Sequence, residues 1–195
     1  GHQVLKEAKL ILEQMSNLYT IASESLNNVR GPLRVGCLDT LAPMLTPELV
    51  FGFGRAFPGV RITLVEGNHE QLLKQLRSAD IDIALTYDLV PANDIAFTSL
   101  AQLPPYVMVG EHHPLATQSA VTIEDLVAMP MVLLDMPWSR EYFLGLFSEA
   151  GVAPNVVMRS SNMEVVRAMV ANGVGFGIAN VRPKAHFSQD GKRLI

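Results

Sequence analysis

Small polar side chains recur directly after short apolar runs in this sequence. Asp39 and Thr40 follow the run 33–38, and Arg140 comes soon after the run 131–134. Hydroxyls, amides and a guanidinium bind small molecules through hydrogen bonds, and an arginine can hold a carboxylate through two parallel bonds. The residues in such positions that we expect to contact a ligand are Asp39, Thr40, Asn68, Tyr87, Trp138, Ser139, Arg140, Ser161 and Asn162.

Each of these residues also has a purely structural interpretation, which the sequence leaves open. Asp39, Thr40 and Asn68 are residue types that form turns or cap helices. Arg140 can be a solvent-exposed arginine, and Trp138, the only tryptophan, can fill a core instead of covering a ligand. A carboxylate at Asp39 would repel an anion, so a ligand that contacts it is expected to carry an amine or hydroxyl groups as well.

The residue types do not predict catalysis, a cofactor or a metal. His69, His112 and His113 have no cysteine or carboxylate cluster at metal-binding spacing. No Gly-x-Ser-x-Gly elbow occurs. The run Gly173-Val174-Gly175-Phe176-Gly177 follows a helix and lacks the third glycine of a dinucleotide fingerprint, so we expect a helix C-cap that enters a tight buried strand. Cys37, the only cysteine, lies in the apolar run 33–38 and is therefore expected to be a buried, unreactive thiol. The alternative, a redox-sensing role, would have no second cysteine to resolve an oxidised form.

The elements that must position these residues alternate along the chain. A capping box at Thr122 and Asp125 predicts the start of a short helix. Ser139 and Asn162 are expected to cap helices that run to Ala150 and Asn172. Strands are predicted at 33–38, 60–65, 81–85, 106–109, 131–134, 156–159 and 176–179, and further helices at 46–57 and 69–78.

Strands separated by single helices indicate βαβ units and parallel sheets. The segment 88–105 is irregular and contains three prolines, so we place a crossing between two α/β lobes there. The predicted division is lobe I at 31–103 and lobe II at 104–195. Two such lobes suggest a cleft, and ligands of open parallel sheets lie beyond the carboxyl ends of the strands. Helix N-termini at these ends favour anions, so the expected ligand is small and anionic.

A long helix is predicted over residues 1–30. Its apolar residues recur at alternating spacings of three and four, which is the repeat of a coiled-coil seam and favours pairing with a second copy. The alternative is an amphipathic helix that lies on its own domain. The seam consists of Leu5, Ala8, Leu12, Met15, Tyr19, Ala22, Leu26 and Val29, and Gly31-Pro32 is expected to end the helix.

The composition is that of a packed globular protein, with 49% hydrophobic and 17% charged residues. The net charge of −4 excludes the basic footprint of a nucleic-acid-binding surface, so any contact with DNA must be made by another segment. The sequence contains no signal-peptide core and no apolar run of about 18 residues that could span a membrane. Together with the lone cysteine, this predicts a cytoplasmic protein.

Several short motifs, in order, resemble the effector-binding domain of LysR-type transcriptional regulators. The run 31–36 resembles the entry into that domain, and Thr40 to Pro47 its first loop and helix start, which adds Leu41 to the expected ligand contacts. Further similar segments are Phe57-Pro58-Gly59-Val60, Val65-Glu66-Gly67-Asn68, Leu72-Leu73, Asp80 to Leu85, His113-Pro114-Leu115 and Gly173 to Ile178. The resemblance covers residues 4 to 182, and it is specific through the order and spacing of its motifs.

The resemblance implies two Rossmann-like lobes, as in type 2 periplasmic-binding proteins, behind a long linker helix. It implies a small-molecule effector in the cleft, a homodimer or homotetramer, and contact with DNA only through a winged helix-turn-helix that would precede residue 1. In the family the chain returns to the first lobe and finishes there with a strand and a helix. This sequence stops at Ile195, so that return is expected to be missing.

Two other classes of protein use a similar scaffold. A solute-binding protein for uptake shares the two-lobe fold, but it would carry a signal peptide or lipidation cysteine and would have no use for the heptad helix. An enzyme would need a convergent set of acid, base or nucleophile side chains, which the sequence does not show. We therefore expect a ligand-sensing regulatory domain.

Overall fold

The computed structural model describes residues 29–88 and 94–195. The chain divides into two compact units between Tyr87 and Asp88. The first 28 residues lie outside the described part, and with them the predicted linker helix and nearly all of its heptad seam. The last seam residue, Val29, is described and is not helical.

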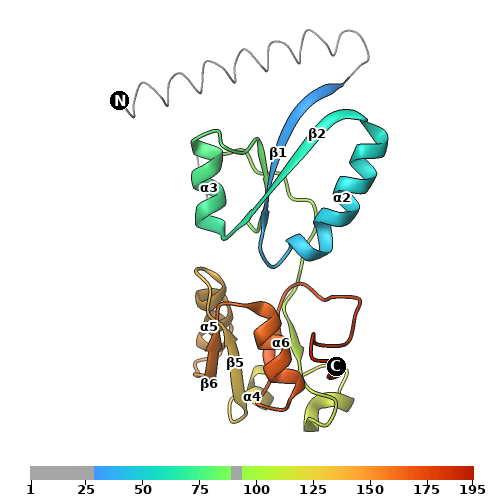
Figure 1. Cartoon of the computed structure of the whole chain (residues 1–195). Helices are drawn as coiled ribbons and strands as arrows, with labels where there is room; N and C mark the ends of the chain where they lie inside the picture. The colour runs from blue at the N-terminus through green and yellow to red at the C-terminus, as the bar shows by residue number, and fades with distance from the viewer. Residues whose placement is uncertain (1–28, 89–93) are drawn as a thin grey trace. The chain divides into compact units, whose positions relative to one another are not determined.

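The first unit is built on three parallel strands. They are β1 (Arg30–Leu38), β2 (Gly59–Gly67) and β3 (Ile83–Leu85), and β1 lies in the centre of the order β2-β1-β3 (Figure 1). Leu38 pairs with Gly67 and Cys37 with Leu85, so the three strands end together. β1 begins three residues before the predicted strand because the backbone is already paired with β2 at Arg30.

Two helices flank these strands, α2 (Ala42–Ala56) and α3 (His69–Arg77) (Figure 1). α2 begins four residues before the predicted start at Thr46, because Pro43 suits a first helical turn. Pro47 is accommodated inside the helix, and the buried Thr46 hydroxyl donates to the carbonyl of Ala42 at 2.8 Å. The core beneath the helices contains Val35, Cys37, Leu38, Leu41, Leu72, Leu73 and Ile81.

An ion pair joins β1 to the segment that precedes β3. The guanidinium of Arg34 lies 2.6 Å from a carboxylate oxygen of Asp82, and the Arg34 backbone N–H donates to the same carboxylate at 2.7 Å. Asp82 returns a bond from its own N–H to the Arg34 carbonyl at 2.8 Å. Burial raises the pKa of Asp82, but the hydrogen bonds and the charge of Arg34 outweigh it, so the pKa of Asp82 is lowered overall.

The second unit also has a sheet, of mixed direction. Its strands are β4 (Tyr106–Met108), β5 (Pro130–Leu134), β6 (Asn155–Ser160) and β7 (Gly177–Ala179). β5 pairs with β6 in parallel, and β4 pairs with β7 antiparallel. Phe176 connects the two pairs, because its N–H donates to Pro130 at 2.9 Å and its carbonyl accepts from Val132 at 2.8 Å. The spatial order is therefore β6-β5-β7-β4.

Helices cover this sheet and begin at caps. α4 (Ile123–Leu126) opens with the predicted capping box at Thr122 and Asp125, and α6 (Met163–Ala171) opens at Asn162 as predicted. The predicted cap of α5 (Ser139–Glu149) is wrong by one residue, because Trp138 holds the cap position and Ser139 is the first helical residue. The 3₁₀ helix η1 (Pro114–Thr117) precedes α4. Their apolar sides enclose a core that includes Leu126, Phe143, Phe147, Val166 and Phe176.

The glycine run after α6 behaves as predicted. Gly173 has a φ of +82° and ends the helix in the left-handed region. Gly175 lies directly against the backbone of Pro130, where a Cβ atom would overlap the Pro130 carbonyl oxygen. Only glycine at this position lets the chain approach β5 closely enough for the backbone N–H and carbonyl of Phe176 to form hydrogen bonds with β5.

The last described residues remain attached to the second unit. Val109 and Ile195 exchange backbone hydrogen bonds of 2.9 and 3.2 Å beside β4. The buried Arg167 of α6 donates to the carbonyls of Ala185 at 3.3 Å and Phe187 at 3.0 Å. A buried guanidinium thus holds the segment that follows β7.

Asp82→Asn is expected to lower the free energy of unfolding at pH 7 by about 1 kcal/mol, since solvent weakens a partly exposed ion pair. Because the folded pKa of Asp82 is lowered, its contribution is present above the unfolded pKa and disappears as the pH falls through the folded pKa. In urea unfolding, the difference in unfolding free energy between variant and parent should begin to shrink near pH 4 and vanish below the folded pKa of Asp82. Glu48→Gln, an exposed carboxylate on α2, is the control; an equal loss in both variants contradicts the role of the ion pair.

Candidate functional site

The five expected contact residues of the first unit lie at one edge of its sheet. Asp39, Thr40 and Leu41 follow β1, Asn68 follows β2, and Tyr87 comes shortly after β3. The Asp39 N–H donates to the Gly67 carbonyl at 3.1 Å, which holds the loop after β1 against the end of β2. Parallel pairing with a common end therefore brings these residues to the same edge.

These residues differ in what remains available to a ligand. Leu41 is 5% exposed and belongs to the core, so its side chain faces the protein. The Asn68 carboxamide oxygen accepts from the Gln71 N–H at 3.0 Å in a capping box, which leaves the amide N–H groups as the donors of this side chain. Thr40 and Tyr87 are half-buried, whereas Asp39 is exposed.

The charge at this edge is negative. Burial raises the pKa of Asp39, and the nearby carboxylate of Glu66 raises it further. A neighbour that donates hydrogen bonds or carries positive charge would relieve both effects. The geometry therefore favours a ligand that presents a donor, a hydroxyl or an amine, to Asp39.

A buried polar pair at the same edge was not predicted from the sequence. His69, the first residue of α3, is 2% exposed, and its Nδ1 lies 2.9 Å from the Thr86 hydroxyl oxygen. This contact connects the start of α3 to the end of β3. The sequence does not predict this pair, because Thr86 lies 17 residues after His69 and no spacing rule relates the two residues.

The five expected residues of the second unit likewise share one edge. Trp138, Ser139 and Arg140 lie shortly after β5, and Ser161 and Asn162 follow β6. The Asp135 N–H donates to the Ser160 carbonyl at 2.8 Å, so the two strand ends are adjacent. The Asn162 side chain accepts from the N–H groups of Glu164 and Val165, whereas Ser161 is exposed and takes no part in that cap.

Arg140 lies within a network of charges. Its guanidinium is 3.0 Å from Asp135 and 2.7 Å from Glu141, and hydrogen bonds to Glu141 and then Asp135 raise the pKa of Arg140. Arg159 of β6 approaches Asp135 at 3.6 Å. Sequence reasoning missed Asp135 and Arg159, which are brought together only by the pairing of β5 with β6. A carboxylate ligand would have to share Arg140 with Asp135 and Glu141.

Trp138 has a backbone conformation that is rare for a large residue. Its φ is +69°, in the left-handed region, which costs roughly 1–2 kcal/mol for a side chain with a Cβ. The Glu141 carboxylate accepts from the Trp138 N–H at 2.9 Å and holds this conformation at the start of α5. The indole is 41% exposed, so the interpretation of Trp138 as a core residue is not what the structure shows.

Cys37 is buried at the end of β1 and is 0% exposed. Burial raises the pKa of its thiol from 9.0 to about 11, and the charges of Glu66 and Asp39 add to the effect. The thiolate is the reactive form, so the environment suppresses oxidation and metal binding at this residue.

Four helices, α2, α3, α5 and α6, begin at these edges, and the positive ends of their dipoles favour an anion. Within residues 29–88 and 94–195, no three histidine, cysteine or carboxylate side chains are grouped to hold a metal ion. None of the helices in this part of the chain has the length and apolarity needed to cross a membrane.

Comparison with known proteins points to one family. The family described as LysR substrate binding domain matches residues 27–187. HTH-type transcriptional regulator CysB of Haemophilus influenzae is 28% identical over 184 residues, which are 91% of this chain and 56% of the relative. The chain thus spans little more than half the length of this curated relative.

Solved structures agree with the sequence match. HinK, a LysR family transcriptional regulator from Pseudomonas aeruginosa, is 34% identical with a TM-score of 0.82, over 97% of this chain and 67% of the other. The BenM effector binding domain, solved with its effector benzoate, shares the fold at 22% identity, with a TM-score of 0.68 over 77% of this chain and 70% of the other.

The buried thiol gives a direct test of the electrostatics at the end of β1. Native Cys37 should react with the disulfide reagent DTNB at pH 8 at least about 100-fold more slowly than Cys37 of the chain unfolded in urea, because its thiolate fraction is lower by about that factor and its buried sulfur is also shielded from the reagent. Absorbance at the wavelength of the released thiolate measures both rates. Comparable rates in the two states would show that the pKa of Cys37 is not raised.

Proposed function

The chain belongs to the family of LysR substrate-binding domains, and on that premise we propose that it is the ligand-sensing part of a transcription regulator. The observation that carries the proposal is the repeated placement of polar residues beside helix N-termini at the strand ends of each unit. We assign the effector contacts to the predicted residues at these edges other than Leu41, whose side chain belongs to the core.

The chemistry of the two edges indicates the class of effector. Helix N-termini and Arg140 favour an acidic group, whereas Asp39 favours a donor. The class of effector that we propose is therefore a small organic acid that also carries hydroxyl or amino groups. Benzoate is the effector of BenM, and we choose it as the first probe for this chain because the two domains share a fold.

The remaining roles belong to the whole protein. We propose that DNA is contacted by a segment outside residues 1–195, since the net charge of these residues is −4. We propose that the effector-binding lobes are residues 31–103 and 104–195. We further propose that the protein has no catalytic activity and is located in the cytoplasm, in line with relatives that are transcription regulators. Uptake of a solute is disfavoured because the family match is to regulators.

Ser161→Ala tests the proposed contacts, because Ser161 is exposed and its neighbour Asn162 provides the helix cap. A thermal-shift panel with benzoate, shikimate, 2-phosphoglycolate and the amino acids selects the probe, and calorimetry measures its affinity. We expect Ser161→Ala to weaken binding about five- to ten-fold, as for one lost hydrogen bond, with unfolding changed by less than about 0.5 kcal/mol.

Ser148→Ala, an exposed serine near the end of α5, is the matched control. Its affinity for the selected probe should equal that of the parent. Equal affinities for all three proteins would remove Ser161 from the binding site. A panel in which no compound raises the melting temperature would contradict the ligand-sensing proposal.

We also propose that the chain forms a homodimer or homotetramer through the heptad seam of residues 5–26, without Val29, which is not helical. Leu12→Glu together with Leu26→Glu places charges in the seam, and sedimentation velocity should then show smaller species than the parent. Gln14→Glu, outside the seam, should sediment like the parent. A monomeric parent chain at high concentration would contradict the proposal.

A further inference from the structure

A pocket within the second unit is separate from the strand-end residues described above. Its volume is about 450 Å³, within the range of about 300–1,000 Å³ that is common for small-molecule sites. All of its lining residues lie between Pro105 and Ile195, so the pocket belongs to one unit alone. It shares no residue with the edge that carries Trp138, Arg140 and Ser161.

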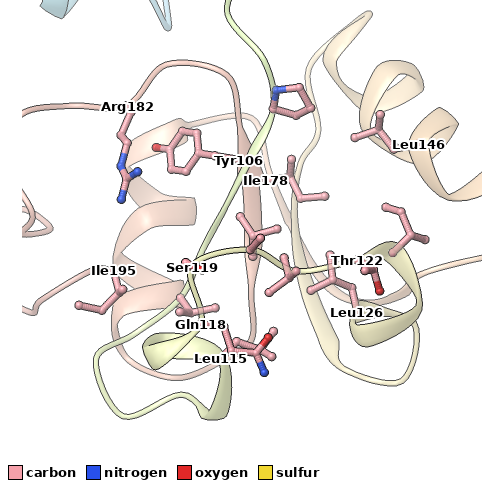
Figure 2. Close-up of a pocket in the computed structure, with 16 residues that line it drawn as sticks. Tyr106, Leu115, Gln118, Ser119, Thr122, Leu126, Leu146, Ile178, Arg182 and Ile195 are labelled. Carbon is pink, nitrogen blue, oxygen red and sulfur yellow. The ribbon is translucent and has the colours of Figure 1, made fainter.

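The walls of this pocket are largely aliphatic. They come from β4, β7, η1, α4 and α5, and Figure 2 shows Ile178, Leu115, Leu126 and Leu146 arranged around the space. Polar side chains are few. Thr122 is already engaged in the capping box of α4, where its hydroxyl donates to Asp125 at 3.0 Å. The main part of a ligand in this pocket must therefore be apolar.

One charged side chain lines the pocket, and it is an arginine. The Arg182 guanidinium carbon lies 5.4 Å from the centroid of the Tyr106 ring, and Figure 2 shows the two side chains side by side. Arg182 is exposed. No carboxylate side chain lines the pocket. Among the ion pairs of the described residues, none involves Arg182.

Tyr106 fixes the position of this cation. Its hydroxyl donates to the Val181 carbonyl at 3.1 Å, which ties the ring to the residue next to Arg182. Burial raises the pKa of Tyr106, while the charges of Arg167 and Arg182 act in the opposite direction. The ring is thus neutral at physiological pH, and its face attracts the guanidinium without neutralising its charge.

We propose that this pocket binds an amphipathic organic anion, an aromatic or branched aliphatic carboxylate, as a second ligand of the domain. The apolar part lies among the side chains of β4, β7 and α4, and the carboxylate is bound by Arg182. The pocket goes beyond the proposed function, because it requires no contact with the strand-end residues.

The test uses 3-phenylpropanoate as the probe and two-dimensional amide NMR to locate it on the whole chain. We expect saturable shifts at Tyr106, Val107, Ile178 and Leu126. Arg182→Gln should weaken binding about ten-fold, as for the loss of a charged hydrogen bond. The neutral analogue 3-phenylpropan-1-ol should bind equally to the parent and to Arg182→Gln.

Two further variants separate this pocket from other sites. Val121→Phe places a larger side chain at a half-buried wall position and should abolish the pocket shifts, with the circular dichroism and melting temperature of a folded protein. Arg61→Gln, an exposed arginine of β2 that does not line the pocket, is the matched control and should leave the affinity unchanged. The proposal is overturned if shifts centre on Ser161 and Asn162, if Arg182→Gln binds like the parent, or if no saturable binding occurs.

Discussion

Parallel pairing of neighbouring strands is the constraint on which the rest of this structure depends. β1 is bonded to β2 on one side and β3 on the other, and β5 is bonded to β6. In each case the strands end in register, so the loops that follow them meet at one edge. The helices begin at that edge, and their N-termini add a positive field to whatever polar side chains the loops carry.

Several residues at these edges have a structural role and a proposed binding role at once. Asn68 and Asn162 cap helices through their side-chain oxygens, and capping leaves their amide groups to donate. Arg140 is paired with Asp135 and Glu141, so an acid that binds it must compete with fixed carboxylates. Such competition lowers the affinity for any acid at Arg140. It therefore selects ligands whose other groups form additional favourable contacts with the protein.

The two kinds of site in the second unit differ in electrostatics. At the strand ends, positive and negative side chains are interleaved, and the strained backbone of Trp138 is held by Glu141. In the pocket beside β4 and β7, Arg182 is the one charged side chain among lining residues that are mainly aliphatic. The first arrangement suits a small polar acid, and the second suits an acid with a large apolar part.

The sequence by itself determined the order of strands and helices, the caps at Thr122 and Asn162, the glycine-dependent turn after α6, and the family. These depend on neighbours within a few residues, which propensity and spacing describe. Tertiary structure alone decided that Leu41 is in the core, that Trp138 rather than Ser139 caps α5, that His69 contacts Thr86, and that Arg182 lines a largely apolar pocket. Those outcomes depend on contacts between residues distant in the chain or on a backbone conformation that tertiary contacts impose. No local pattern encodes either, because burial and charge pairing follow from how the strands and helices pack.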